Sequence, residues 1–362
     1  RQSWPRTRGK AQGLRARGSE RKVMAATELA SHGVELSADA GLSDGVSRLR
    51  FADSADLLLA ACWDGTLRVF DTARQRVRLP QRAPVLDAVF AAGGSSSVAY
   101  SGGMGCVVKS HDLATKEEED IGRHDATVRC VEVVESTGYV VSGSWDMSVR
   151  CWDARAPPTS RMVALLGMPG KVLSMSAHGN KLVVATAGRH VLIYDSRMLS
   201  ANSHPEQQRE SSLKYQTRCV QCYPDGTGYA LSSVEGRVSL EYFDPSEQAQ
   251  AKKYAFKCHR KKDGGRDTVY PVNAIAFHPQ HGTFASGGCD GIVNVWDGNN
   301  KKRLMLYRPY PTSIASLAFN HNGTLLAVAS SYTYEEGERD HPPDQIFLRT
   351  VQPAEVEPKP KQ

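Results

Sequence analysis

Four residues in one short segment have the types that a hydrolytic enzyme uses. His124, Ser142 and Asp146 lie close together in the chain, and Trp152 follows them. A serine, a histidine and an acidic residue can form a nucleophilic triad, in which the histidine removes the hydroxyl proton of the serine. Such a triad also needs an exposed serine and hydrogen-bond donors for the oxyanion. Whether these residues form a catalytic site or a buried polar network depends on the strands and loops that carry them.

Other chemistry-bearing patterns are weak. Cys219-Val-Gln-Cys222 is one isolated CxxC inside a strand-like pattern, with no second cysteine pair or histidine pair to complete a zinc site. The remaining cysteines occupy apolar strand-like positions, which favours reduced, buried thiols. The glycines fall at strand ends and turns, and no phosphate-binding glycine motif opens a helix. The sequence therefore predicts no metal, no cofactor and no nucleotide.

A repeated unit organises most of the chain. Each unit reads as an apolar strand rich in small residues, a tight turn at Asp or Gly, and an alternating strand that ends in an aromatic residue and Asp. Successive units are 41, 41, 42, 49 and 53 residues apart and end at Asp71, Asp112, Asp153, Asp195, Asp244 and Asp297. This period and the Trp-Asp ending are typical of WD40 repeats, so we predict an all-β propeller.

A seventh unit completes the ring. Residues 314–351 supply three strands, and the early segment 34–36 can supply the fourth. This closure pairs the two ends of the chain and leaves only short edges, which is how propellers avoid exposed sheet edges. We predict a seven-bladed propeller over residues 34–352, a disordered basic arm or translated leader over 1–33, and a disordered tail over 353–362.

Within this repeat the four residues of the first paragraph match the structural tetrad of a WD unit. There the turn Asp146 and the loop His124 form a hydrogen bond, and Ser142 and Trp152 continue the network. Buried polar groups need such partners. We therefore predict a structural role for all four and no catalytic residue.

Two further tryptophans are not explained by packing within the repeat. Trp63 and Trp145 each precede a turn Asp, two blades apart, whereas the other units have smaller or aliphatic residues there. The turn between the second and third strands of a blade lies on the top face of a propeller, so both rings should be presented there. They are either anchors for a bound peptide or rings packed flat on a neighbouring blade.

The fifth unit brings three cations to the same face. Arg218, Arg237 and Lys257 stand at the start of its first strand, the start of its third and the end of its fourth, and His259 and Arg260 follow. Arginine suits the recognition of carboxylates and phosphates. The alternative is an ordinary solvated charged surface.

The net charge of +6 is concentrated at the N-terminus. Residues 1–23 hold eight Lys and Arg and one Glu, and the remaining chain is nearly neutral with 37 basic and 38 acidic residues. Met24 is interpreted as the natural start, and residues 1–23 as a translated leader or disordered arm, with a transit peptide or a basic binding tail as alternatives.

The neutral body argues against nucleic acid as a direct partner. No apolar run is long enough to span a membrane, and we expect an intracellular protein.

Five motifs resemble one WD40 family closely: ESSLKYQTRC (Glu210–Cys219), SSVEGRV (Ser232–Val238), YAFKCHR (Tyr254–Arg260), YPVNAIAFHP (Tyr270–Pro279) and PTSIASLAF (Pro311–Phe319). The chain resembles the spindle-checkpoint family that is third in the budding-uninhibited-by-benzimidazole series. The messenger-RNA-export propellers that bind a nucleoporin are similar, but KYQTR and PTSIASLAF favour the checkpoint family.

This resemblance implies a non-enzymatic adaptor in the nucleus, and at kinetochores in mitosis, as part of the mitotic checkpoint complex. It implies binding to the GLEBS segments of checkpoint kinases and kinase-like proteins through Trp63, Trp145 and Arg218. It also implies binding to the phosphorylated Met-Glu-Leu-Thr repeats of a kinetochore scaffold through Arg237 and Lys257. Two departures from the family pattern are the turn Met104-Gly105-Cys106 and the arm before Met24. Export-type binding to a nucleoporin and an enzyme on a propeller scaffold stay open as alternatives.

Overall fold

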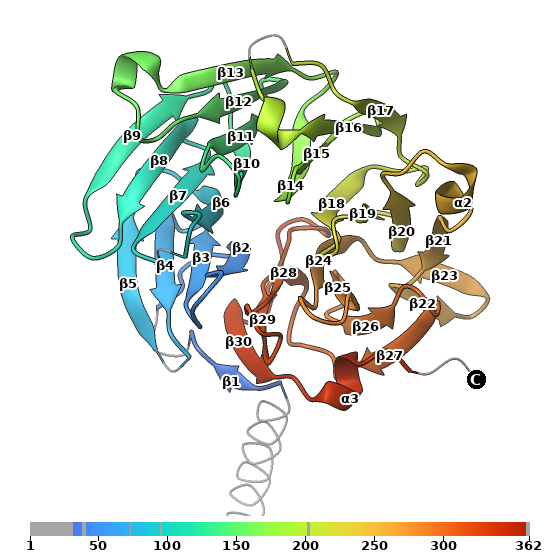
Figure 1. Cartoon of the computed structure of the whole chain (residues 1–362). Coiled ribbons are helices and arrows are strands. Elements are labelled where there is room, and N and C mark those ends of the chain that lie inside the picture. The colour runs from blue at the N-terminus through green and yellow to red at the C-terminus, as the bar shows by residue number, and fades with distance from the viewer. Residues whose placement is uncertain (1–31, 38–40, 73, 95, 201–202, 360–362) are drawn as a thin grey trace, which may run out of the picture.

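The computed structural model describes residues 32–37, 41–72, 74–94, 96–200 and 203–359 of the 362-residue chain. Seven four-stranded antiparallel sheets stand in a ring like the blades of a propeller, as Figure 1 shows. The predicted seven-bladed fold is confirmed. In blades one to six the chain runs from the innermost strand outward.

The strands follow the repeat. Blades one to three are built from β2 (Val46–Phe51), β3 (Leu58–Cys62), β4 (Thr66–Phe70), β5 (Gln75–Pro80); β6 (Val85–Phe90), β7 (Val98–Gly103), β8 (Val107–Asp112), β9 (Glu118–Arg123); and β10 (Val128–Val133), β11 (Val140–Ser144), β12 (Ser148–Trp152), β13 (Met162–Gly167). Blades four to six are built from β14 (Val172–His178), β15 (Lys181–Thr186), β16 (His190–Asp195), β17 (Gln207–Glu210); β18 (Thr217–Cys222), β19 (Gly228–Ser233), β20 (Arg237–Tyr242), β21 (Tyr254–Lys257); and β24 (Val272–Phe277), β25 (Phe284–Gly288), β26 (Val293–Asp297), β27 (Lys302–Leu306).

Blade seven joins the two ends of the chain. Its strands β28 (Ile314–Phe319), β29 (Leu325–Ser330) and β30 (Gln345–Thr350) are followed on the outside by β1 (Val34–Glu35). Val34 pairs with Leu348 and Glu35 with Phe347, and the Leu36 amide donates to the Ile346 carbonyl at 2.8 Å. The segment expected to close the ring therefore pairs with the last strand, visible in Figure 1 as blue β1 beside red β30.

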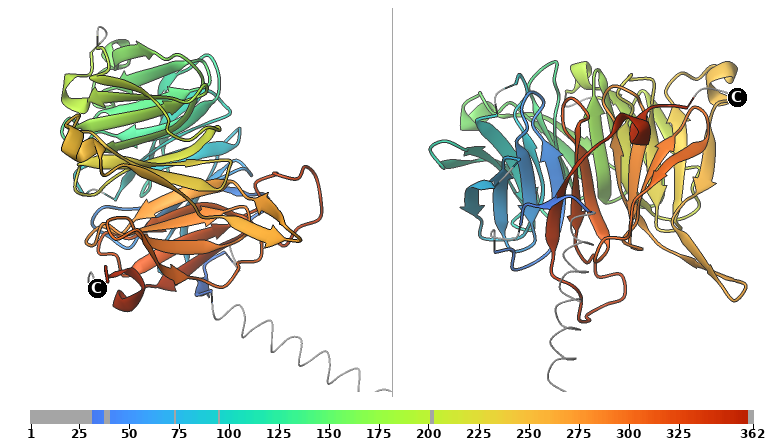
Figure 2. Two further views of the ribbon diagram at one scale, coloured as in Figure 1. Left: turned by 90° about the vertical axis from the view of Figure 1, so that its right-hand side faces the viewer. Right: turned by 90° about the horizontal axis from the view of Figure 1, so that it is seen from below.

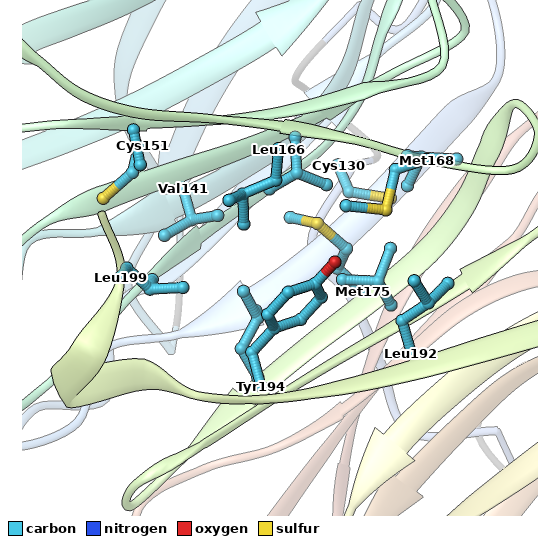
Figure 3. Packing of buried hydrophobic residues seen from close by; sticks show 14 of the residues in the cluster. Cys130, Val141, Cys151, Leu166, Met168, Met175, Leu192, Tyr194 and Leu199 are labelled. Carbon is cyan, nitrogen blue, oxygen red and sulfur yellow. The ribbon is translucent and has the colours of Figure 1, made fainter. Parts of the chain in front are cut away.

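The core lies between neighbouring blades, because the faces of each sheet are apolar. Between blades three and four, Figure 3 shows Met168, Met175 and Tyr194 interleaved with Cys130 and Cys151. All eight cysteines are free thiols, and burial raises the pKa of Cys130 and Cys151 to about 12. These thiols therefore remain protonated and act as small apolar packing groups.

The two ends of the propeller differ from the sequence expectation. His32, in the segment predicted as a disordered arm, is buried, and its Nε2 lies 2.8 Å from the Pro309 carbonyl. At the other end, residues predicted as a disordered tail form the short helix α3 (Pro353–Val356). Val356 is buried against the core of blades six and seven, and Glu355 accepts from Arg349 at 2.8 Å. Composition suggested disorder, but the burial of Val356, the ion pair of Glu355 and a hydrogen bond from Thr283 to the Val356 carbonyl hold this turn in place. Residues 1–31 and 360–362 lie outside the described part of the chain.

Two insertions project from the ring on one side, the hairpin β22 (Arg260–Asp263) and β23 (Arg266–Val269), and the loop between β29 and β30. Figure 2 shows both, in orange and red, beyond the ends of the blades. The short helix α2 (Glu247–Gln250) lies in the connection between β20 and β21. Among the described residues, no helix is long and apolar enough to cross a membrane.

Candidate functional site

The turns between the second and third strands have the same geometry in the blades that carry the tryptophans. Asp64 accepts from the Thr66 amide at 3.0 Å, and Asp146 accepts from the Ser148 amide at 2.9 Å, so each aspartate side chain closes its own turn. The residue after each Asp adopts a positive φ, at Gly65 (71°) and Met147 (63°). This turn holds the residue before the Asp, which is Trp63 in blade one and Trp145 in blade three, at one end of its blade.

The innermost strands share a second feature, a β-bulge near the start of each strand. In all seven blades the register between the first two strands shifts near the start of the inner strand, which leaves one residue out of the pairing. The residues left out are Ser47, Leu86, Arg129, Leu173, Arg218, Asn273 and Ala315. These bulges form a ring of positions, one in each blade, at the end of the propeller where the tryptophan turns also lie.

The turns and bulges together form one pocket, which we call the rim pocket. It has a volume of about 590 Å³ and is lined by Asp44, Gly45, Val46, Ser47, Trp63, Leu86, Arg129, Trp145, Arg218, Asn273, Ala315, Tyr332, Thr333 and Tyr334. Six of the seven bulge residues are among them. The structure thus brings together Trp63, Trp145 and Arg218, the three residues assigned from the sequence to peptide binding.

The two tryptophans differ in exposure. Trp63 is 41% exposed, whereas Trp145 is half-buried and has the Lys171 ammonium 5.9 Å from its ring centre. The alternative in which each ring packs flat on a neighbouring blade therefore fits Trp145 in part, and it does not fit the more exposed Trp63. Arg218 is exposed, so its guanidinium is accessible from solvent.

Sequence reasoning missed part of the rim pocket. Arg129 occupies the bulge of blade three, equivalent to Arg218 in blade five, and is half-buried. Tyr332, Thr333 and Tyr334 come from the loop between β29 and β30, which the sequence marked only as polar. Aligning the start of the inner strand in every repeat would have found Arg129. No repeat signal covers the tyrosines, because that loop occurs in one blade only.

Blade three contains the four-residue network. The neutral His124 donates from Nδ1 to Asp146 at 2.9 Å, and Ser142 donates to Nε2 at 2.7 Å. The indole of Trp152 donates to the Ser142 hydroxyl at 2.8 Å. The order Asp, His, Ser is that of a catalytic triad, but Ser142 and His124 are buried and Trp152 occupies the remaining side of the hydroxyl. A substrate cannot reach Ser142, so this arrangement stabilises the blade.

The electrostatics of the network agree with this role. Burial lowers the pKa of His124, although Asp146 opposes the shift, so the imidazole is neutral near pH 7. Burial alone would raise the pKa of Asp146, but hydrogen bonds from Ser148, the Asp125 amide and His124 hold it at about 2. A neutral histidine next to a charged aspartate is a stable hydrogen-bonded pair.

Blade six contains a second network of the same kind. His259 lies 2.8 Å from Asp290 through Nδ1 and 2.9 Å from Ser286 through Nε2, and Trp296 donates to Ser286 at 2.9 Å. His259 is fully buried. The sequence placed His259 only as following the three rim cations, and the structure shows its ring inside this buried network. His259 connects blade five to blade six because it follows β21 and contacts the turn of the next blade.

Arg237 and Lys257 are neighbours on adjacent strands. Arg237 begins β20, Lys257 ends β21, and the two residues are directly paired in the ladder. Cross-strand partners have Cβ atoms about 5 Å apart, so both side chains leave the same face of the sheet next to each other. Lys257 is exposed, and the Arg237 Nε lies 3.5 Å from Glu235. The structure thus brings these two cations together, in the same blade as Arg218.

A buried ionic bridge lies along the inner strands of blades one to three. Arg50 donates to both carboxylate oxygens of Glu132, at 2.8 and 2.5 Å, and lies 3.4 Å from Asp87. Burial raises the pKa of Glu132, and Arg50 opposes this shift. The bridge connects blade one to blade three, the two blades that carry Trp63 and Trp145. Among the described residues, no group of three or more His, Cys, Asp and Glu side chains is arranged to hold a metal ion.

The fold, the turn aspartates and the tetrads define a WD40 β-propeller. Residues 36–71, 117–153 and 255–297 match the family described as WD domain, G-beta repeat. The chain is 56% identical to the mitotic checkpoint protein BUB3.1 of Arabidopsis thaliana, over 88% of this chain and 93% of that protein. It is 46% identical to the mitotic checkpoint protein bub3 of Dictyostelium discoideum, over 85% and 92% of the two chains. A poly(A)+ RNA export protein of Schizosaccharomyces pombe is more distant, at 33% identity over 88% and 91%. The chain belongs to the Bub3 family of mitotic checkpoint proteins, as the sequence motifs predicted.

Proposed function

We propose that this protein is a non-enzymatic adaptor of the spindle assembly checkpoint. It binds GLEBS segments of checkpoint kinases and kinase-like proteins at the rim pocket and phosphorylated Met-Glu-Leu-Thr motifs of a kinetochore scaffold at Arg237 and Lys257. It thereby recruits the kinases to unattached kinetochores in mitosis, where it contributes to the mitotic checkpoint complex. Membership of the Bub3 family supports the checkpoint role, and the rim pocket is the observation that carries the partner assignment.

The rim pocket has the composition of a peptide-binding site. Trp63 and Trp145 supply apolar rings from blades one and three, and a partly exposed tryptophan gains most when a partner covers it. Tyr334, which is exposed and lies beside the buried Tyr332, adds aromatic surface from blade seven. A segment that lies across this end of the propeller can contact Trp63, Trp145 and Tyr334.

Two arginines give the pocket its preference for acidic segments. Arg218 and Arg129 stand at bulge positions in blades five and three, and neither lies within 4 Å of a carboxylate of the described residues. A glutamate of the bound segment would pair with Arg218 in a partly dry setting, where charge-assisted hydrogen bonds are strong. This preference agrees with GLEBS glutamates as the partner of Arg218.

The pair of Arg237 and Lys257 suits a phosphothreonine. A phosphate carries a charge of about −1.5 to −2 and three acceptor oxygens, so two converging cations discriminate it strongly from a hydroxyl. Each charge-assisted hydrogen bond contributes about 1.5–3 kcal/mol. After desolvation, a net difference of about 3 kcal/mol, or roughly 100-fold, is expected between phosphorylated and unmodified peptides.

Calorimetry with two peptides tests the assignment. A GLEBS peptide and a phosphorylated Met-Glu-Leu-Thr peptide are titrated into the wild-type protein and into the Arg237→Ala/Lys257→Ala variant. The variant should keep the GLEBS affinity and lose the phosphopeptide. Undiminished phosphopeptide binding would overturn the phosphate site, and loss of both ligands would show that the sites are not separable. Preference for a nucleoporin peptide over the kinase peptide would instead favour the export-type function.

A further inference from the structure

The hairpin β22–β23 lies outside the seven sheets of the propeller. Its two strands pair only with each other, from Arg260 opposite Val269 to Asp263 opposite Arg266. The tip is Gly264-Gly265, with φ values of 53° and 83°. Two successive residues with positive φ are typical of the type I′ turn, which matches the twist of the flanking strands. The insertion is therefore a regular element with a defined direction, as Figure 2 shows.

The base of the hairpin is fixed beside Arg237. The Cys258 amide donates to the Gly236 carbonyl at 2.9 Å, and the Tyr270 amide donates to the His259 carbonyl at 3.1 Å. A Cβ at Gly236 would lie 2.5 Å from the His259 carbonyl oxygen and 3.0 Å from that of Tyr270, so only glycine permits this close contact. The residue after Gly236 is Arg237.

Arg260 braces the hairpin against the same turn. Its Nη2 donates to the Glu235 carbonyl at 2.9 Å, and its Nη1 lies 3.6 Å from Asp267 on the opposite strand. From the other side, the buried His259 ties the base to Asp290 of blade six. The hairpin is thus held at a set position next to Arg237 and Lys257.

The exposed part of the hairpin is basic. It carries four cations, Arg260, Lys261, Lys262 and Arg266, against Asp263 and Asp267, a net charge of +2 in a protein body that is nearly neutral. Lys261, Lys262 and Arg266 are exposed. Of these, none lies within 4 Å of a carboxylate among the described residues, because Asp267 is directed to Arg260. Arg260 is engaged at the base, so Lys261, Lys262 and Arg266 are the hairpin cations available to a ligand.

We infer that the hairpin β22–β23 extends the phosphothreonine site and binds acidic residues that flank the phosphothreonine of the same peptide. The inference rests on the proposed function, since it needs the phosphate at Arg237 and Lys257. Lys257 and Lys261 are four residues apart, and an extended peptide advances about 3.3 Å per residue, so a flanking Asp or Glu reaches the hairpin within a few residues. Lysines act as compact, mobile point charges, which suits acidic side chains without a fixed geometry. The absence of aromatic side chains on the described hairpin favours an acidic peptide over single-stranded nucleic acid, which binds through stacking as well as charge.

The test compares two phosphopeptides that differ only in their flanks. Both contain the phosphorylated Met-Glu-Leu-Thr motif, one with uncharged flanks and one with Asp and Glu flanks. Wild-type protein should bind the acidic-flank peptide about tenfold more tightly at low ionic strength, and the ratio should shrink as salt is added. In Lys261→Glu/Lys262→Glu the ratio should fall to one or below, while the uncharged-flank peptide keeps its affinity within about threefold.

A matched control separates the local effect from net charge. Lys252→Glu/Lys302→Glu makes the same charge change at exposed positions, before β21 and at the start of β27, at the opposite end of these blades. The control should retain the tenfold preference. An unchanged ratio in the hairpin variant, or an equal loss in the control, would overturn the inference. If phosphorylation itself makes no difference to wild-type binding, the proposed function fails instead. Loss of binding to a single-stranded RNA oligonucleotide, with the peptide ratio intact, would assign the hairpin to nucleic acid and also reject the inference.

Discussion

Blade three carries two tryptophans seven residues apart that have opposite surroundings. Trp152 is 5% exposed and its indole completes the network of Asp146, His124 and Ser142. Trp145 precedes that same Asp146, lies at the rim pocket, is half-buried and has the Lys171 ammonium 5.9 Å from its ring centre. One residue type therefore serves the interior of the blade at one position and its outer surface at the other.

The comparison separates residues that resemble a catalytic site from those that we propose as a binding site. The Ser, His and Asp groups are buried and fully hydrogen-bonded, whereas the rim pocket has exposed rings and arginines without carboxylate partners among the described residues. Changes in the network should therefore alter the free energy of unfolding, and changes in the rim pocket should alter peptide affinity. The predictions below test that division.

The largest effect is expected at Trp152. Trp152→Ala removes a buried ring that packs on Gly122 and leaves the Ser142 hydroxyl without its donor, which should cost about 3–5 kcal/mol of unfolding free energy. Chemical denaturation measures this loss. Trp145→Ala is the matched control, since it deletes the same side chain from the rim and should cost no more than about 1 kcal/mol. Equal losses in the two variants would contradict the division.

Reversing the charge at Arg218 should have the next largest effect. Arg218→Glu adds repulsion to the lost pairing with a GLEBS glutamate, and should weaken binding by about 3 kcal/mol or more. The melting temperature should not change, because Arg218 is exposed. Arg218→Lys should restore binding in part, and Arg129→Glu should weaken it through the equivalent bulge position. Full activity of Arg218→Lys would show that a point charge suffices.

The repeat made the architecture predictable, and the rim pocket was predictable only in part. The spacing of Asp71, Asp112 and Asp153 fixes the blade period, and each blade repeats one set of local interactions. Trp63 and Trp145 could be found because they deviate from a repeated position. The network of His259 was not predicted, because its partner Asp290 lies in the next blade, 31 residues away, and sequence order does not reveal that contact. The helix at Pro353–Val356 was missed because its stability comes from Val356 packing in the core of blades six and seven and from Glu355 accepting from Tyr307, 48 residues away.

Truncation of Trp63 and Trp145 tests whether the two rings serve peptide binding or packing between blades. Trp63→Ala and Trp145→Ala should each weaken GLEBS binding by about 2 kcal/mol, roughly 30-fold, if a partner covers the rings. The effect of Trp63 on stability should be the smaller of the two, since its ring is more exposed. Calorimetry and thermal melts on both variants measure the two quantities. A lowered melting temperature with unchanged peptide affinity would show that the rings serve packing between blades.

The smallest expected effect comes from pH and concerns blade two, where His111 occupies the position of Trp152. His111 is fully buried, its Nε2 lies 2.7 Å from Ser101, and burial lowers its pKa to about 4. The unfolded chain binds a proton at this histidine near pH 6.5, whereas the folded protein does not, so stability falls as the pH drops below about 6.5.

His111→Phe should remove this contribution, since blade one has Phe70 at the same place. Denaturation at about pH 7 and pH 5.5 should show a loss that is about 1 kcal/mol smaller in the variant than in the wild type. Loss of the Ser101 contact shifts both values equally and leaves the difference intact. No histidine is among the described residues that line the rim pocket, so peptide affinity of the folded protein should not follow the stability curve. An identical pH dependence in wild type and variant would mean that His111 gains a proton in the folded protein as easily as in the unfolded chain, which its burial opposes.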